Sequence, residues 1–278
     1  MPKNMLIGSV NFSFAPYEFY LMGILNVTPD SFSDGGCYNN LDAALFQAQR
    51  LIKEGCHIID VGGESTRPGH TVISDEEEIE RTAPIIAALK KEFDIPISID
   101  TYKSAVAQAA LEAGCDLIND IWGLKADPLL AKVIAKYDVP CVLMHNRNNT
   151  DYQSLIPDII ADLSETLTIA QNAGIDEKKI ILDPGIGFGK SYEQNLLVLK
   201  HLQDLTVLDY PWLLGISRKS VIGLTLNLPP EEREEGTIAL NTWGLSQGMQ
   251  IFRIHDVEKN RRALLMQQAI WKAGVENG

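Results

Sequence analysis

Short apolar runs alternate along the whole chain with longer stretches in which apolar residues recur at helical spacing. Short apolar runs between polar residues are typical of buried parallel strands, and the longer spacing is typical of amphipathic helices. The runs predict strands at residues 20–25, 57–61, 96–99, 116–119, 140–144, 179–182, 212–216 and 250–254. The stretches between them predict helices at residues 41–55, 77–93, 103–114, 127–137, 156–174, 192–205, 236–248 and 256–274.

Several predicted helices end in a glycine, the residue that most readily adopts the left-handed conformation at a helix end. These glycines are Gly55, Gly114, Gly174, Gly248 and Gly274. Strand–helix units repeated in this way indicate parallel βαβ connections.

The repeat predicts an α/β fold of the (β/α)₈ TIM-barrel type. An open doubly wound sheet is the alternative, but the regular repeats and the lack of a Gly-rich turn after the first strand favour the barrel. No linker or shift in composition divides the sequence. We therefore expect a single domain over residues 1–278, with a short N-terminal hairpin at 1–19 that caps the bottom of a barrel at 20–278.

Polar residues follow nearly every predicted strand. In a TIM barrel the carboxyl ends of the strands meet at one rim, where the active site is built. Any single Asp or Asn there could equally cap the next helix, but the whole set favours a functional ring. The set comprises Asn26, Asp60, Asp100, Asn119, His145, Asp183, Ser217, Arg218, Lys219, Arg253 and His255.

Composition narrows the function classes. The net charge is −13 and the pI is about 4.8, so the protein repels nucleic-acid phosphates and we expect no nucleic-acid partner. The acidic runs at 75–80 and 230–235 are interpreted as solvated helix faces. No apolar run is long enough to span a membrane and no secretory signal is recognised, so we expect a cytoplasmic protein. The four cysteines show no metal-binding spacing and are interpreted as buried thiols.

Basic residues gather at the expected rim in spite of the acidic background. Lys219 follows the seventh predicted strand, Arg253 and His255 end the eighth, and Arg67 lies in the loop at 62–69. The loops after strands seven and eight commonly bind phosphate in this fold. These residues therefore predict an anion seat, although lone basic residues are often salt-bridge partners.

Asp100, Asn119 and Asp183 form a second set across the rim. Carboxylates and an amide on rigid strands suit a flat heterocycle that is rich in N–H donors. A glycosidase acid–base pair or a metal site are alternatives that the set fits less well. The stretch 183–191 is not a P-loop, because Pro184 replaces its required glycine; its glycines predict a flat loop beneath a planar ligand, with Phe188 as a wall.

These segments together resemble the dihydropteroate synthase family from about residue 20 to residue 257. The segments that carry the resemblance are GILNVTPDSFSDGG, DVGGESTRPG, SIDTYK, INDIWG, LMHNR, ILDPGIGFGK, LGISRKSVIG and RIHDV. The resemblance implies a Mg²⁺-assisted transferase of folate biosynthesis that acts as a homodimer. Its substrates would be 6-hydroxymethyl-7,8-dihydropterin diphosphate and p-aminobenzoate, and its products 7,8-dihydropteroate and diphosphate.

The resemblance also assigns roles by motif. Asp100, Asn119, Asp183 and Lys219 would bind the pterin edge in a pocket lined by Ile121, Met144 and Phe188. Asn26, Arg67, Arg253 and His255 would hold the diphosphate, with Asn26 also on Mg²⁺. Phe32, Thr66, Pro68 and Ser220 would frame p-aminobenzoate, and Asp34 would order the first loop. Asp34, Asp100, Lys219 and Arg253 would be the catalytic residues of an S_N1-like step.

Two other functions stay open. A pterin-binding methyltransferase that acts with a corrinoid protein is not expected to carry the SFSDGG and STRPG loops. A non-catalytic pterin-binding paralogue would be expected to lose residues that are present here, among them Arg67 and Lys219. The apolar segment at 262–271 is compatible with a dimer face and equally with a stripe facing the core.

Overall fold

The computed structural model describes residues 4–28, 37–64 and 72–274. Within these residues, eight parallel strands form one sheet in the order β8-β7-β6-β5-β4-β3-β10-β9. The strands are β3 (Tyr20–Asn26), β4 (Ile58–Gly62), β5 (Ile97–Asp100), β6 (Leu117–Asp120), β7 (Cys141–Met144), β8 (Ile180–Asp183), β9 (Leu213–Leu214) and β10 (Ile251–Ile254). A parallel bridge between Leu182 and Trp212 joins the two ends of the sheet, so the strands close into a barrel.

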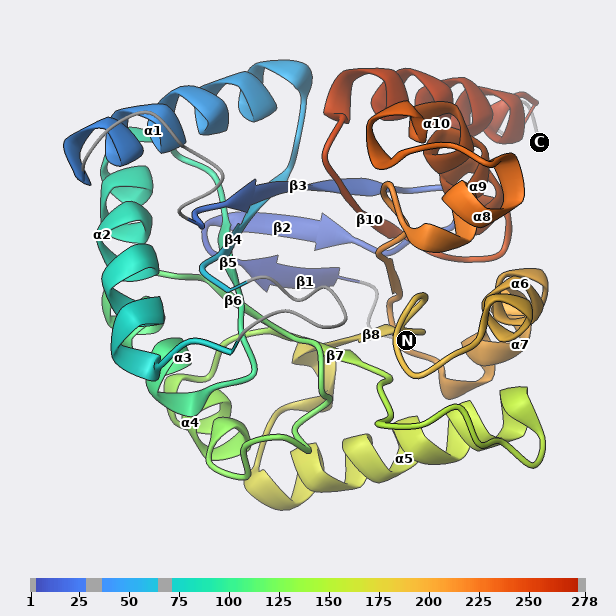
Figure 1. Ribbon diagram of the computed structural model, residues 1–278, viewed down its shortest axis with the longest axis horizontal. Coiled ribbons are helices and arrows are strands. Elements are labelled where there is room, and N and C mark those ends of the chain that lie inside the picture. The colour runs from blue at the N-terminus through green and yellow to red at the C-terminus, as the bar shows by residue number, and fades with distance from the viewer. Residues whose placement is uncertain (1–3, 29–36, 65–71, 275–278) are drawn as a thin grey trace.

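Helices surround this barrel as a ring (Figure 1). They are α1 (Cys37–Glu54), α2 (Asp75–Glu92), α3 (Ser104–Glu112), α4 (Leu130–Tyr137), α5 (Leu155–Ala173), α6 (Tyr192–Lys200), α7 (Leu202–Leu205), α8 (Ser220–Leu226), α9 (Glu234–Ser246) and α10 (Val257–Lys272). The predicted TIM-barrel fold is therefore confirmed. In the described part of the chain, no helix combines the length and apolar character that a bilayer crossing requires.

Helix ends follow the local chemistry of the sequence. All five glycines predicted to end helices have positive φ, between 85° and 103°. The N-terminus of α2 is capped by Ser74, whose side chain accepts a hydrogen bond from the Glu77 N–H. The acidic first turn of α2 and the lysines in its last turn match the helix dipole.

The structure departs from the sequence prediction around the seventh strand. The predicted helix at 192–205 is interrupted at His201, and β9 is only two residues long. Helix α8 was not predicted at all, although Asn227, which ends it at φ 56°, is a residue that commonly ends helices in the left-handed conformation. Strand β9 ends at Leu214 and α8 begins at Ser220, so Lys219 is the N-cap residue of α8.

The N-terminal hairpin, β1 (Asn4–Ile7) paired with β2 (Val10–Ser13), closes the bottom of the barrel as predicted. Its apolar side chains pack against the lower, inward-facing residue of seven of the strands. Together they form one buried cluster of Met5, Ile7, Phe12, Phe14, Met22, Ile58, Leu117, Val142, Ile181, Leu213 and Ile251.

The same strands place their polar residues one layer higher. Successive side chains of a strand alternate between its two faces, so the residue two positions after an inward-facing residue also faces inward. The residues that follow the apolar layer in this way include Asp60, Asn119, Met144, Asp183 and Arg253. The barrel therefore has an apolar floor plugged by the hairpin and a mostly polar layer at its mouth.

This floor predicts a large contribution of the hairpin to stability. We expect Phe12→Ala to lower the free energy of unfolding by about 3–5 kcal/mol, because Phe12 is fully buried and its loss opens a cavity. Chemical denaturation monitored by circular dichroism measures the change. Val10→Ala on the same hairpin is the control, since Val10 is 38% exposed and should cost well under half as much. Equal effects of the two substitutions would contradict the plugged floor.

Candidate active site

Arg253 organises the polar layer at the mouth of the barrel. Its Nε donates to Asp60 Oδ2 at 2.6 Å and its Nη2 donates to Asp100 Oδ2 at 2.7 Å. The amide of Asn119 also donates to Asp60 Oδ2, at 3.2 Å. Burial by itself would lower the pKa of Arg253, but Asp60 and Asp100 outweigh it and raise that pKa. The guanidinium is thus a permanent cation between two carboxylates.

The second oxygen of each carboxylate is left without a partner. Asp60 Oδ1 and Asp100 Oδ1 are buried and accept no hydrogen bond from any described residue. Buried polar atoms are normally paired, so an unpaired acceptor inside a barrel mouth points to a ligand that donates hydrogen bonds there. Burial raises the pKa of Asp100 to about 7, Arg253 opposes that rise and Asp60 adds to it.

Asp183 and Lys219 lie together on the other side of the mouth. Both surround Gly215, where an added Cβ would lie 3.6 Å from Asp183 Oδ2 and 3.8 Å from Lys219 Nζ. Burial raises the pKa of Asp183 while Lys219 lowers it, and burial lowers the pKa of Lys219 to about 8 while Asp183 opposes that change. Burial thus shifts the pKa of the acid upward and that of the base downward, a pattern that is common at functional sites.

The loop between β8 and α6, residues 184–191, forms a wall beside Lys219. The Lys219 ammonium lies 4.6 Å from the centre of the Phe188 ring and donates a hydrogen bond to the Ile186 carbonyl. Phe188 therefore lies beside the site, and it contacts the lysine that the sequence assigns to the same pocket. The aromatic ring of Phe188 is therefore the part of this loop that contacts the Lys219 ammonium, as in a cation–π interaction.

The remaining predicted site residues occupy different surroundings. Ile121 and Met144 are buried near the mouth. Asn26 is exposed at the end of β3, and Ser220 is exposed at the start of α8. His255 is tied through Nδ1 to the Ser217 hydroxyl at 2.9 Å. The other predicted site residues lie outside the described residues: Phe32, Asp34, Thr66, Arg67 and Pro68.

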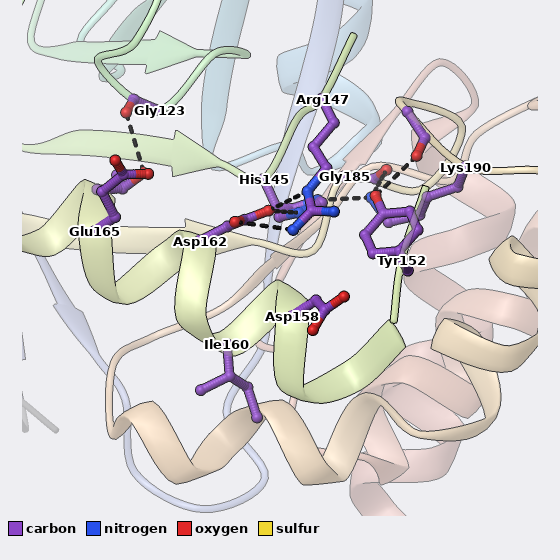
Figure 2. A network of polar contacts seen from close by, with 12 residues as sticks. Gly123, His145, Arg147, Tyr152, Asp158, Ile160, Asp162, Glu165, Gly185 and Lys190 are labelled. Carbon is purple, nitrogen blue, oxygen red and sulfur yellow. Dashed lines mark hydrogen bonds and ion pairs between the residues drawn. The ribbon is translucent and has the colours of Figure 1, made fainter. Parts of the chain in front are cut away.

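Two predicted rim residues act differently from the rest of the ring. Two nitrogens of Arg253 are committed to carboxylates, so any contact of Arg253 with a diphosphate would use the rest of its guanidinium. His145 points away from the barrel interior toward α5, where its Nε2 contacts Asp162 Oδ2 at 2.9 Å (Figure 2). Strand-end position alone does not show which way such a side chain turns.

A buried ion cluster beside the second βα loop escaped the sequence reasoning. Lys103 Nζ donates to Glu64 at 2.7 Å, to Glu78 at 2.8 Å and to the Ile73 carbonyl at 2.8 Å. Glu78 belongs to the acidic run that the sequence analysis assigned to solvent, yet it is 1% exposed. This cluster holds Glu64 and Ile73, which lie on either side of residues 65–71. The sequence feature that could have revealed it is Glu78, a glutamate at a helical position that faces inward.

Few side chains in the described part of this site are candidates to bind a metal ion. In the described ranges, no three His, Cys, Asp or Glu side chains are grouped as a metal cage. Asn26 offers an exposed amide at the end of β3, and its Oδ1 lies near Gly62. An amide oxygen suits Mg²⁺, which commonly takes one or two protein ligands and completes its shell with phosphates and water.

Comparison with known proteins places this site in a family. A family model described as "Pterin binding enzyme" matches residues 22–255. The chain is 57% identical over 267 residues to a dihydropteroate synthase of Clostridium beijerinckii, and the match covers 96% of this chain and 99% of the relative.

Solved structures agree with this match. The dihydropteroate synthase of Clostridium difficile, determined in the presence of pteroic acid, has a TM-score of 0.90 and 50% identity, with coverage of 91% of this chain and 97% of that chain. The Xanthomonas albilineans enzyme with 4-aminobenzoic acid has a TM-score of 0.92 and 38% identity, with coverage of 98% and 99%.

The fold and the polar mouth thus define a TIM-barrel pterin-binding enzyme. Asp100, Asn119, Asp183 and Lys219, which lie in this mouth, are the groups that the sequence resemblance assigned to a pterin. The chain belongs to the dihydropteroate synthase family.

The pKa shifts predict a bell-shaped pH dependence of kcat/KM for the pterin substrate. Asp100 gains a proton as the pH falls through about 7, and Lys219 loses one as the pH rises through about 8. The roles that the resemblance assigns to Asp100 and Lys219 require the carboxylate and the ammonium together, so activity should be highest between these values. Steady-state rates measured across pH test this, and Asp100→Asn should remove the acidic limb from the remaining activity. A profile that is flat from about pH 6 to about pH 9 would contradict the assignment.

Proposed function

We propose that this protein condenses 6-hydroxymethyl-7,8-dihydropterin diphosphate with p-aminobenzoate and releases 7,8-dihydropteroate and diphosphate. The observation that carries the proposal is the 57% identity to a dihydropteroate synthase across 96% of the chain. The relatives solved with pteroic acid and with 4-aminobenzoic acid support both halves of the product. The unpaired buried acceptors in the mouth fit the N–H donors of an aminopyrimidine.

The side chains of the mouth can bind the pterin as a flat donor-rich ring. Asp100, Asn119 and Asp183 hold its edge through hydrogen bonds, and Phe188 and Lys219 close one side of the pocket. Ile121 and Met144 supply the apolar lining. Asp100, Asn119, Met144 and Asp183 belong to rigid strands and Ile121 directly follows one, which is the arrangement that positions a ligand best.

The same groups assist departure of the diphosphate. As the bond from the methylene carbon to the diphosphate breaks, positive charge spreads into the dihydropterin ring. The carboxylates of Asp100 and Asp183 favour that charge, and the amine of p-aminobenzoate then attacks the carbon and loses a proton. Arg67, Arg253 and His255 neutralise the leaving anion, while Phe32, Thr66, Pro68 and Ser220 frame the amine and Asp34 orders the first loop.

Mg²⁺ is the proposed cofactor. Asn26 would be its protein ligand, and the metal would supply positive charge that neutralises the diphosphate and makes it a better leaving group. Its single amide oxygen agrees with a metal that is held mainly by the substrate.

The activity is tested by supplying both substrates with Mg²⁺ and measuring diphosphate release with and without p-aminobenzoate. We expect turnover by the wild type, its suppression by a chelator, and a fall of kcat/KM by about 10²–10³-fold in Lys219→Ala. Lys259→Ala is the matched control, because Lys259 forms an exposed ion pair with Glu234. Full turnover by Lys219→Ala would overturn its role. Arg253→Ala is less informative, because unpairing buried carboxylates costs about 3–5 kcal/mol of stability.

We also propose a homodimer. Large apolar side chains remain exposed on the adjacent helices α6, α8 and α9, and on α10, where Leu264 faces the core but Met266 is 62% exposed. Burial of such side chains against a second copy would remove them from water. The exposed set on α6, α8 and α9 is Leu196, Leu197, Leu224, Leu226 and Trp243.

Sedimentation tests the dimer, for which we expect about twice the chain mass of 30.7 kDa. Leu224→Glu should shift the protein to monomer, because Leu224 is 65% exposed on α8. Leu129→Glu, at a residue 56% exposed beside α4, should leave the mass unchanged. A monomeric wild type would contradict the proposal.

We further propose that the protein works in the cytoplasm, since Cys56, Cys115 and Cys141 are free buried thiols.

A further inference from the structure

The loop between β8 and α6 is built around the ammonium group of Lys190. This group donates to the Gly185 carbonyl at 2.9 Å and to the Phe188 carbonyl at 3.0 Å. Its third contact is His145 Nδ1, at 2.8 Å. A lysine has three N–H donors, so all three are used and the loop is wrapped around one cation.

The backbone of this loop fits directly against the chain that follows β7. Gly185, Gly187 and Gly189 all have positive φ, at 68°, 86° and 55°. A Cβ on Gly185 would lie 1.9 Å from the His145 carbonyl oxygen, and one on Gly189 would lie 2.6 Å from the Arg147 carbonyl oxygen. All three glycines thus adopt a conformation that disfavours other residues, and Gly185 and Gly189 also lie in close contact with the backbone that follows β7.

A chain of contacts from α5 holds Lys190 in place (Figure 2). Asp162 on α5 accepts from Arg147 Nε at 2.6 Å and contacts His145 Nε2 at 2.9 Å. Because a carboxylate only accepts and an ammonium only donates, the His145 proton lies on Nε2 and Nδ1 accepts from Lys190. Burial lowers the pKa of His145 to about 3, so its ring is neutral and suited to accept.

The loop in turn fixes the two groups that face each other across Gly215. The Gly185 N–H donates to Asp183 Oδ1 at 2.7 Å, which leaves Oδ2 on the side of Gly215 and Lys219. The Ile186 carbonyl accepts from Lys219, and the Phe188 ring lies against the same ammonium. Both contacts depend on the loop conformation, which Lys190 stabilises through its hydrogen bonds to the Gly185 and Phe188 carbonyls.

We propose that Lys190 is a positioning residue of the pterin pocket, which acts through the loop 184–190 on Asp183, Lys219 and Phe188, and that Asp162 acts on it through His145. Lys190 does not touch the substrate in this arrangement. Its role is to fix the direction of one carboxylate oxygen and the place of one ammonium, and small displacements of such groups weaken a binding site strongly. The inference rests on the proposed function, because it takes the pterin as the ligand of this mouth.

Charge supports the same conclusion. Burial lowers the pKa of Lys190 to about 7 and Asp183 opposes that change, with Lys219 and Arg147 lowering it further and Asp162 raising it. Lys190 is also one of the cations, after Lys219, that lower the pKa of Asp183. In its protonated form Lys190 therefore lowers the pKa of Asp183 and favours the carboxylate, which can accept from the pterin edge.

The test uses the full-length protein and 6-hydroxymethyl-7,8-dihydropterin, which lacks the diphosphate. We expect Lys190→Met to raise the Kd of this probe by about tenfold or more, because loss of the charged hydrogen bonds releases the loop. The kcat/KM for the pterin diphosphate should fall by a similar factor. The KM for p-aminobenzoate at saturating pterin should stay within about twofold. A smaller fraction of folded protein would lower kcat but leave Kd and both KM values unchanged, so the rise in the Kd of the probe separates the two explanations.

Asp162→Asn provides a second variant, remote from the pterin. An amide cannot accept from His145 and from both Arg147 nitrogens at once, so a donor faces a donor and the support of Lys190 is disturbed. We expect the Kd of the probe to rise severalfold in this variant. Asp158→Asn is the matched control on the same helix, because Asp158 accepts only from the Gln153 and Ser154 N–H groups in the described part of the chain, and it should change Kd by less than about twofold.

Lys90→Met controls for the loss of a lysine, because Lys90 pairs with Asp116 at the opposite end of the barrel. The inference is overturned if folded Lys190→Met and Asp162→Asn bind the probe within about twofold of the wild type, or if Lys90→Met weakens it equally. If Lys190→Met does not fold, the result for Asp162→Asn decides. If the wild type turns over while these variants bind normally, only the positioning role fails. If the wild type shows no turnover, the proposed function fails first.

Discussion

Arg253 sits between two carboxylates in the interior of a barrel, and the mouth of this protein depends on that arrangement. Arg253 donates to both Asp60 and Asp100 and so offsets the repulsion between two carboxylates that are buried close together. The strand register supplies the geometry, since the three residues come from three different strands that meet at one level. The pair of unpaired oxygens that remains is what makes the mouth a receptor for hydrogen-bond donors.

Much of this organisation could be read from the chain. The strand and helix periods predicted the barrel, and the five terminal glycines predicted helix ends. The polar strand ends predicted Asp100, Asn119 and Asp183 as one set, and the family resemblance added Lys219 to it. These features are local or follow from the fold class, so they are encoded in short segments. The predicted hairpin was also found in place.

Features that depend on side-chain direction were not accessible in the same way. Position after a strand did not distinguish His145, which faces α5, from Asp183, which faces the interior. Nor did the acidic run at 75–80 reveal that Glu78 turns inward to Lys103, because the partner lies far away in the sequence. The break near His201 and the short β9 follow from how the last strands close the barrel, which no local pattern encodes.

The N-terminal hairpin has a consequence for biosynthesis. Residues 4–13 are translated before every strand of the barrel, yet their packing partners include Ile251 on β10, and the Phe14 carbonyl accepts a hydrogen bond from Gln250. The apolar face of the hairpin therefore stays without its full set of partners until β10 has been translated. Contacts of such long sequence separation form late and slow the search for the native state. During that interval the nascent chain carries an exposed apolar surface of the kind that chaperones bind.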